Sequence, residues 1–212
     1  MLHSAWAGLV QAGFRLLYTR FAWMYDAVAS LVSLGEWPLW GRAALAHLGD
    51  GPVLEIGSGP GYLLAPLAER DRLAVGLDRS PDMARLAWPR RGAAYVTLGQ
   101  SEALPFTTGA FATVVSVFPA PYIVEAATVD EVCRVLAPGG RLVVVDHAVL
   151  LGRDPYSRIV NLAYALTSSS LEASTLPVQL EARGFSVRRV AHEMRRARVN
   201  ALVAEKSRQD SL

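Results

Sequence analysis

Short apolar runs rich in β-branched residues alternate with helical stretches from Val53 onward. This alternation is typical of a parallel sheet that is covered by helices on both faces. The runs are almost continuously apolar, as strands buried on both faces are. We therefore expect strands at residues 52–56, 73–78, 94–98, 112–117 and 141–146.

Two further β-rich runs, 185–191 and 198–205, are separated by only a few residues. A link this short cannot hold a crossover helix, so the two strands should pair antiparallel. The predicted fold is α/β: a doubly wound, Rossmann-like, seven-stranded, mostly parallel sheet with an antiparallel last strand. One compact domain is expected for 212 residues, with a main domain at 50–212 and a helical extension at 1–49.

Helix boundary signals fit between the strands. Ser80 is a good N-cap, and Pro81 suits the first position of a helix. The segment 136–140 (LAPGG) should stop a helix, because a proline and two glycines follow its last apolar residues. A last helix is expected over 171–183.

Residues 1–49 should be helical, with a second helix from Pro38 to about His47. In the first helix, apolar side chains recur at a spacing of three to four residues: Trp6, Val10, Phe14, Leu17, Phe21 and Met24. Such an aromatic, mildly basic helix can pack over the sheet as a lid, or it can lie on a membrane surface through residues 1–30. The two interpretations are compatible, and both stay open.

Composition narrows the functional classes. Every uncharged run in the N-terminal third, 27–35 among them, is shorter than the ~20 apolar residues that span a bilayer. We expect a cytoplasmic protein, either free or peripheral at the inner face of the membrane. A net charge of +2 gives no nucleic-acid footprint, and a single cysteine excludes an internal disulfide or a cysteine zinc cluster. No metal site is predicted, and no oligomeric state follows.

Six arginines gather near the C-terminus: Arg183, Arg188, Arg189, Arg195, Arg196 and Arg198. They are either a solvated face of edge strands, or a contact for anionic lipid headgroups or an acidic substrate.

The segment 53–61 (VLEIGSGPG) runs from a buried strand through a glycine-rich turn toward a helix. Glycines permit backbone angles and close ligand approach that a Cβ forbids, and a helix N-terminus offers N–H groups. A ligand should therefore bind at this turn, just after Glu55. Tyr62 stands where a dinucleotide-binding fingerprint has its third glycine.

Asp78 ends the second strand, 17 residues after Gly61. An acceptor here would reach the ribose hydroxyls of a ligand that lies across the switch point of the sheet. The alternative is that Asp78 caps the helix near Pro81, although Ser80 already supplies that cap.

With segments 99–106 (GQSEALPF) and 134–142 (RVLAPGGRL), these motifs resemble the class I S-adenosylmethionine-dependent methyltransferases over about residues 50–147. The resemblance implies S-adenosylmethionine as cofactor and S-adenosylhomocysteine as product. It implies that Asp78 holds the ribose. The further cofactor contacts that it implies are Glu55, Gly57, Ser58, Gly59, Gly61, Arg79, Met83, Gln100, Ser101, Glu102 and Phe118. Gln100 stands where relatives usually carry an acid, but its amide oxygen can still accept a hydrogen bond.

The segments 18–26 (YTRFAWMYD) and 33–40 resemble the N-termini of quinone-precursor C-methyltransferases and of some bacterial phospholipid N-methyltransferases. In those relatives the Tyr-Asp pair closes over the cofactor, which would make Tyr25 a lid residue. A tyrosine packed in the core with its hydroxyl satisfied is the alternative.

Methyl transfer requires alignment of the nucleophile with the methyl group and exclusion of water. The ends of the fourth and fifth strands should face the acceptor. The segment 118–122 (FPAPY) offers an apolar wall with the hydroxyl of Tyr122, and His147 is the candidate base, although histidines at strand ends often have a structural role.

We therefore expect a small, lipophilic acceptor, namely a quinone precursor or a phospholipid amine. The Asn/Asp-Pro-Pro-Tyr signature of many nucleic-acid and protein methyltransferases is absent at 118–121. One alternative is an NAD(P)-dependent oxidoreductase, which Tyr62 and the antiparallel pair of last strands disfavour. The other is a non-catalytic, membrane-associated scaffold of the same fold.

Overall fold

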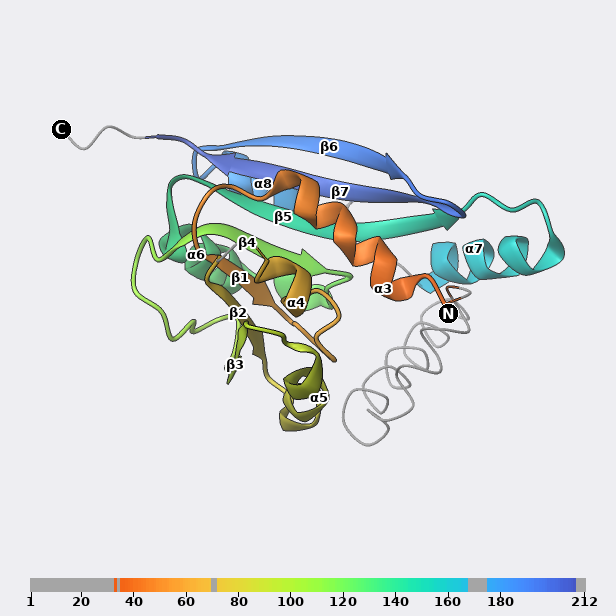
Figure 1. Ribbon diagram of the computed structural model, residues 1–212. Coiled ribbons are helices and arrows are strands. Elements are labelled where there is room, and N and C mark those ends of the chain that lie inside the picture. Colours follow the sequence, from red (N-terminus) through yellow and green to blue (C-terminus); the bar gives the residue numbers. More distant parts are fainter. Residues whose placement is uncertain (1–32, 34, 70–71, 168–174, 209–212) are drawn as a thin grey trace, which may run out of the picture.

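A computed structural model describes residues 33, 35–69, 72–167 and 175–208. A seven-stranded sheet with the order β3-β2-β1-β4-β5-β7-β6 forms its centre (Figure 1). The strands are β1 (Val53–Ile56), β2 (Ala74–Asp78), β3 (Tyr95–Leu98), β4 (Phe111–Val117), β5 (Leu136–Leu150), β6 (Phe185–Glu193) and β7 (Ala197–Lys206).

The sheet confirms the predicted fold class. β1 to β5 are parallel, whereas β7 pairs antiparallel with both β5 and β6. β1 lies between β2 and β4, so the strand order reverses beside it. In open α/β sheets, ligands bind outside the carboxyl ends of the strands at such a switch point. The glycine-rich turn follows β1 directly.

Helices cover both faces of the sheet. They are α3 (Trp37–Trp40), which continues as the 3₁₀-helix η2 (Gly41–His47), then α4 (Leu64–Leu67), α5 (Pro81–Ala87), η3 (Trp88–Arg90), η4 (Pro121–Val124), α6 (Ala126–Val135), α7 (Pro155–Thr167) and α8 (Leu176–Glu181). The prediction of a helix from about Pro38 to His47 is confirmed. The predicted first helix and Tyr25 lie outside the described residues. The division at residue 50 stays a prediction.

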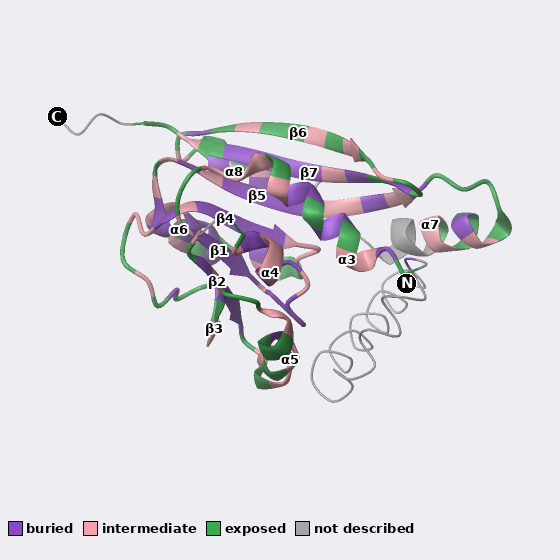
Figure 2. Cartoon of the chain, viewed as in Figure 1, coloured by how far each residue is buried: buried purple, intermediate pink, exposed green. Residues whose placement is uncertain are grey.

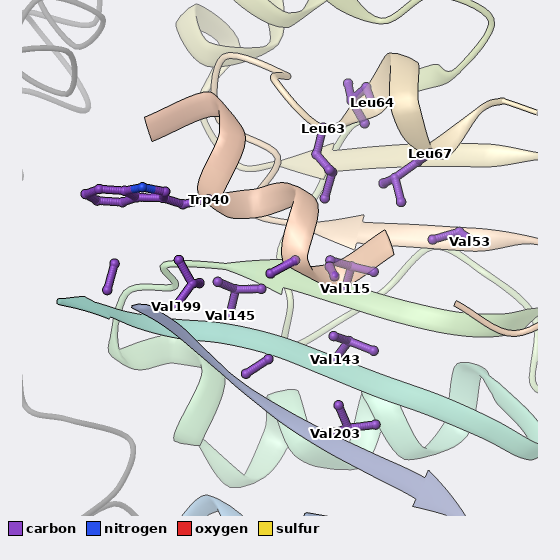
Figure 3. Close-up of a cluster of buried hydrophobic side chains, with 14 of the residues drawn as sticks. Trp40, Val53, Leu63, Leu64, Leu67, Val115, Val143, Val145, Val199 and Val203 are labelled. Atoms are coloured by element: carbon purple, nitrogen blue, oxygen red, sulfur yellow. The ribbon is translucent and has the colours of Figure 1, made fainter. Parts of the chain in front are cut away.

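Two apolar layers hold the sheet because successive side chains of a strand point to opposite faces. Val53 packs with Trp40, Leu64 and Val143 in one layer (Figure 3). Leu54 belongs to the other layer, which α6 and α8 cover. Figure 2 shows the result: the central strands are buried almost throughout, whereas β6 is mostly exposed or half-buried at the sheet edge.

Several predicted boundaries are confirmed. The Ser80 side chain accepts a hydrogen bond from the Met83 backbone N–H at 3.3 Å, and Pro81 opens α5. α6 ends at Val135, before Pro138. Within the described residues the last helix runs from Leu176 to Glu181, shorter than the predicted 171–183, and part of that range lies outside the described residues.

The prediction that the fifth strand spans 141–146 is wrong, because β5 extends from Leu136 to Leu150. β5 keeps pairing with β7 as far as Leu150 and Ala197, well past the end of β4 at Val117. The reason is that β7 offers a long, mostly buried partner. β5 and β7 therefore project as an antiparallel arm, and α7 packs near the end of this arm (Figure 1).

Among the described residues, no helix combines the length and apolar character needed to cross a membrane.

Candidate functional site

The turn between β1 and α4 is shaped by three glycines with positive φ: 71° at Gly57, 51° at Gly59 and 80° at Gly61. Its first two N–H groups, those of Gly57 and Ser58, both donate to the carbonyl of Leu77 in β2, at 2.8 and 3.1 Å. The turn is therefore fixed to the neighbouring strand. A Cβ added at Gly59 would meet nothing within 4 Å, so open space lies beside the turn.

Asp78 connects this turn to the start of α5. One carboxylate oxygen accepts from the Gly59 N–H and the other from the Ser80 N–H, each at 2.8 Å. Asp78 is only 8% exposed. Burial raises the pKa of the Asp78 carboxyl, and the two N–H donors oppose that rise. The carboxylate thus holds the turn and helix together, and Ser80, as expected, supplies the helix cap.

Glu55 lies in β1 directly before the turn and is 3% exposed. Burial, followed by the nearby charge of Asp78, raises the pKa of Glu55 to about 8. Its Oε2 and the Oγ of Ser58 are buried and have no hydrogen-bond partner among the described residues. Buried polar atoms normally have partners. These two unpartnered atoms and the open space at Gly59 fit a polar ligand at the turn.

The other predicted cofactor residues follow β2 and β3, which end side by side with Asp78 opposite Leu98. Met83 is fully buried, and Arg79 is exposed. Ser101 is buried and accepts from Thr128 Oγ1 at 3.0 Å, whereas its neighbours Gln100 and Glu102 are exposed. These residues therefore lie around the same edge of the sheet as the glycine-rich turn.

An aromatic cluster of Trp37, Trp40 and Phe118 lies at the end of β4. The Phe118 ring centroid is 4.5 Å from that of Trp37 and 6.2 Å from that of Trp40. Phe118 has a φ of 45°, which is uncommon for a residue with a side chain and stores about 1–3 kcal/mol of strain. Its N–H donates to the Val145 carbonyl at 2.7 Å, which holds this conformation.

The Tyr122 side chain contacts the start of the glycine-rich turn. Its hydroxyl donates to the Ile56 carbonyl at 3.2 Å and lies 3.1 Å from Ser116 Oγ. A side chain at Gly57 would overlap this hydroxyl. Sequence reasoning placed Tyr122 on the acceptor wall, and the structure places its hydroxyl against the start of the turn.

The prediction that His147 stands at a strand end is wrong, because β5 continues through it to Leu150, with His147 opposite Asn200 of β7. The register between β5 and β7 shifts between Val145 and His147, which leaves Asp146 as the extra residue of a β-bulge. His147 nevertheless lies just beyond the end of β4, since Val117, the last residue of β4, pairs with Val145.

The bulge carries a buried carboxylate that sequence reasoning did not single out. The Asp146 side chain is 2% exposed and pairs with Arg189 of β6 at 3.2 Å. Burial raises the pKa of Asp146, and the Arg189 guanidinium opposes that rise. The signal available in the sequence was Arg189 itself, one of two adjacent arginines that must face opposite sides of an edge strand.

A family model described as a methyltransferase domain matches residues 53–140. The chain is 32% identical to a demethylmenaquinone methyltransferase from Thermus thermophilus over 203 residues, which cover 81% of this chain and 92% of that protein. It is 36% identical to one from Beutenbergia cavernae over 128 residues, 58% of this chain and 53% of that protein. The chain thus spans about half the length of some curated relatives it matches and nearly all of another.

Solved structures share the fold. The YcgJ protein from Bacillus subtilis has a TM-score of 0.58 at 18% identity, covering 81% of this chain and 99% of that one. Geranyl diphosphate C-methyltransferase from Streptomyces coelicolor has a TM-score of 0.58 at 13% identity, covering 79% and 78%.

The domain match covers the glycine-rich turn and Asp78, and the Thermus relative extends the likeness over most of the chain. The chain belongs to the class I S-adenosylmethionine-dependent methyltransferases, and its cofactor is S-adenosylmethionine.

Proposed function

We propose that the protein transfers a methyl group to a ring carbon of a reduced quinone precursor of the demethylmenaquinone type. The observation that carries the proposal is the likeness over 203 residues to a demethylmenaquinone methyltransferase. The aromatic cluster supports it, because Trp37 and Phe118 offer flat apolar faces beside the carboxyl end of β4, next to Val145 of β5. A planar ring acceptor stacks on such faces, whereas a small amine gains less from them.

For the cofactor, we propose that the turn formed by Gly57, Ser58, Gly59 and Gly61 holds the methionine part and that Asp78 accepts from the ribose. The support is the open space at Gly59 together with the unpartnered Glu55 Oε2 and Ser58 Oγ. Around the adenine we place Arg79, Met83, Gln100, Ser101 and Glu102. Phe118 would lie between the cofactor and the two tryptophans of the aromatic cluster, Trp37 and Trp40.

Asp78→Ala is expected to weaken S-adenosylmethionine binding at least tenfold. The variant removes the carboxylate that would accept a hydrogen bond from the ribose. It also leaves the Gly59 and Ser80 N–H groups, which shape the turn, without their acceptor. Isothermal titration measures the affinity. Asp82→Ala is the matched control, since Asp82 lies four residues later, in the first turn of α5, and its side chain pairs with the exposed Arg85. Equal affinity of Asp78→Ala and the parent would contradict the assignment.

The chemistry asks little of the protein beyond alignment and a proton acceptor. The bound cofactor supplies a methyl group on a cationic sulfur, which is a good leaving group. The acceptor gives up a ring hydroxyl proton, its neighbouring carbon bonds to the methyl group as the carbon–sulfur bond breaks, and the electron pair stays on sulfur. The ring hydrogen then leaves as a proton.

We place the proton transfers at the β5 bulge. His147 follows Asp146 there, and the ion pair between Asp146 and Arg189 joins the bulge to β6. A carboxylate and an imidazole can both accept a proton in general acid–base catalysis, and burial raises the pKa of the Asp146 carboxyl.

Trp37→Leu is expected to raise KM for the reduced quinone about tenfold, because the variant removes the indole stacked 4.5 Å from Phe118. Cofactor affinity should stay unchanged. Trp88→Leu is the matched control, since Trp88 is 59% exposed on η3. Transfer of labelled methyl to the reduced precursor and to phosphatidylethanolamine vesicles gives the readout. Label in the phospholipid alone, or in neither acceptor while the cofactor binds, would overturn the quinone assignment.

A further inference from the structure

α7 carries apolar and cationic side chains on a face that the core does not use. Ile159 and Leu162 are 67% and 61% exposed, and they stand three residues apart on one side of the helix. Leu151, which follows β5, is 46% exposed. We call the α7 patch the set formed by these and the nearby arginines: Leu151, Ile159, Leu162, Arg153, Arg158 and Arg196.

The inner face of α7 is firmly attached to the arm. The Asn161 side chain donates to the Leu150 carbonyl and accepts from the Leu150 N–H, both at 2.9 Å. Tyr156 and Val160 pack against the core, and Ser157 is 2% exposed. Folding therefore fixes the helix through its inner side, and the outward Ile159 and Leu162 are not needed for that attachment.

The patch is continuous with the tip of the β6–β7 hairpin. The Leu151 N–H donates to the carbonyl of Arg196 at 2.8 Å, which brings this exposed arginine next to the apolar side chains. Figure 1 shows α7 at the end of the arm, remote from α5, and Figure 2 shows exposed residues along α7 and the loop before it.

The charge around the patch is positive and uncompensated. No carboxylate of the described residues forms an ion pair with Arg153, Arg158 or Arg196. The adjacent carboxylate of Asp154 is engaged by Ser157, both at its N–H and at its hydroxyl.

Two acidic side chains near the hairpin tip already form ion pairs with other arginines. Glu36 pairs with Arg195, and Glu193 pairs with Arg198. A cluster of outward leucine and isoleucine side chains fringed by free arginines matches a surface of apolar chains beneath anionic headgroups.

We propose that the α7 patch docks the protein on an anionic lipid bilayer. Its use in catalysis rests on the proposed function, because a quinone precursor with an apolar tail is reached from the membrane. β5 links the two places directly: the bulge at Asp146 and His147 lies in the same strand whose end carries α7. Docking through α7 thus brings the acceptor side of the sheet close to the lipid surface.

Co-sedimentation of the full chain with vesicles tests the proposal. The parent is expected to bind vesicles of phosphatidylcholine mixed with phosphatidylglycerol and to bind pure phosphatidylcholine weakly. Ile159→Gln/Leu162→Gln should lower the partition coefficient at least tenfold, because the two apolar side chains would no longer be buried in the bilayer. Arg158→Gln should lower it about fivefold.

The matched controls are Val178→Gln, at a valine 68% exposed on α8, and Arg85→Gln on α5. Both should bind vesicles as the parent does. Equal binding of the Ile159→Gln/Leu162→Gln variant and the parent would overturn the proposal. So would a parent dimer that this variant converts to a monomer, because the patch would then be an interface between two copies.

A second readout separates this surface from the quinone assignment. Methyl transfer to a short-chain, water-soluble reduced quinone should be unchanged in Ile159→Gln/Leu162→Gln, while transfer to a long-chain acceptor in anionic vesicles should fall with binding. A parent that binds vesicles but methylates neither quinone refutes the quinone assignment and leaves the docking surface standing. A parent that methylates the soluble quinone but binds no vesicles refutes the docking surface alone.

Discussion

Gly61→Ala is expected to lower the free energy of unfolding by about 3 kcal/mol, from left-handed strain of about 1–2 kcal/mol and an overpacking penalty of similar size. Gly61 has a φ of 80°, and an added Cβ would lie 2.8 Å from the Cβ and 2.9 Å from the Cα of Ala87. No side-chain rotation relieves this contact, because Ala87 presents backbone at the end of α5. In a chain of this length, thermal unfolding should shift down by about 10 °C.

Gly59→Ala is the matched control, since it makes the same chemical change in the same turn. Its φ is 51°, but an added Cβ would meet nothing within 4 Å. Thermal unfolding should shift by only about 3 °C, as expected for backbone strain alone. S-adenosylmethionine binding should nevertheless weaken, because the new methyl group enters the space assigned to the cofactor. Two variants with equal losses of stability would contradict this account of the turn.

The turn illustrates what the sequence could predict. A buried strand followed by Gly57, Gly59 and Gly61 has local causes, namely backbone angles and a helix start, and these are visible in nine consecutive residues. The same holds for Ser80, whose capping bond spans three residues. The class I resemblance then predicted a set of cofactor residues, and these lie at or after the ends of β1, β2, β3 and β4.

The region proposed to face the acceptor was less predictable because its causes are not local. The length of β5 depends on its pairing with β7, more than forty residues later in the chain. The bulge at Asp146 and its partner Arg189 come from that pairing. α7 was not predicted either: its helical face is defined by Asn161 binding the Leu150 backbone, a contact that no periodicity reveals. The aromatic cluster joins Trp37 to Phe118, which are about eighty residues apart in the chain but pack against the same apolar layer, so only the fold brings the two together.

Glu55→Gln is expected to remove a strong pH dependence of stability. Because the pKa of Glu55 is raised to about 8 in the folded protein, the native state keeps a proton that the unfolded chain releases near pH 4.5. The unfolded chain therefore binds fewer protons across this window, and the free energy of unfolding falls as pH rises. The slope is about 1.4 kcal/mol per pH unit, so this one group removes about 4 kcal/mol between pH 5 and pH 8. Denaturant unfolding at a series of pH values measures the effect.

In Glu55→Gln the free energy of unfolding should change less with pH over that window. The variant should also be more stable than the parent at pH 8, because its buried amide has no charge to desolvate. Glu69→Gln, at an exposed glutamate, should follow the parent curve. Cofactor binding should show the reverse trend. The cationic sulfur and amino group of S-adenosylmethionine favour the ionised carboxylate, so affinity should rise with pH in the parent and stay flat in Glu55→Gln. If the parent and Glu55→Gln instead share one stability profile from pH 5 to pH 8, Glu55 is ionised in the folded protein and its burial beside Asp78 has no energetic effect.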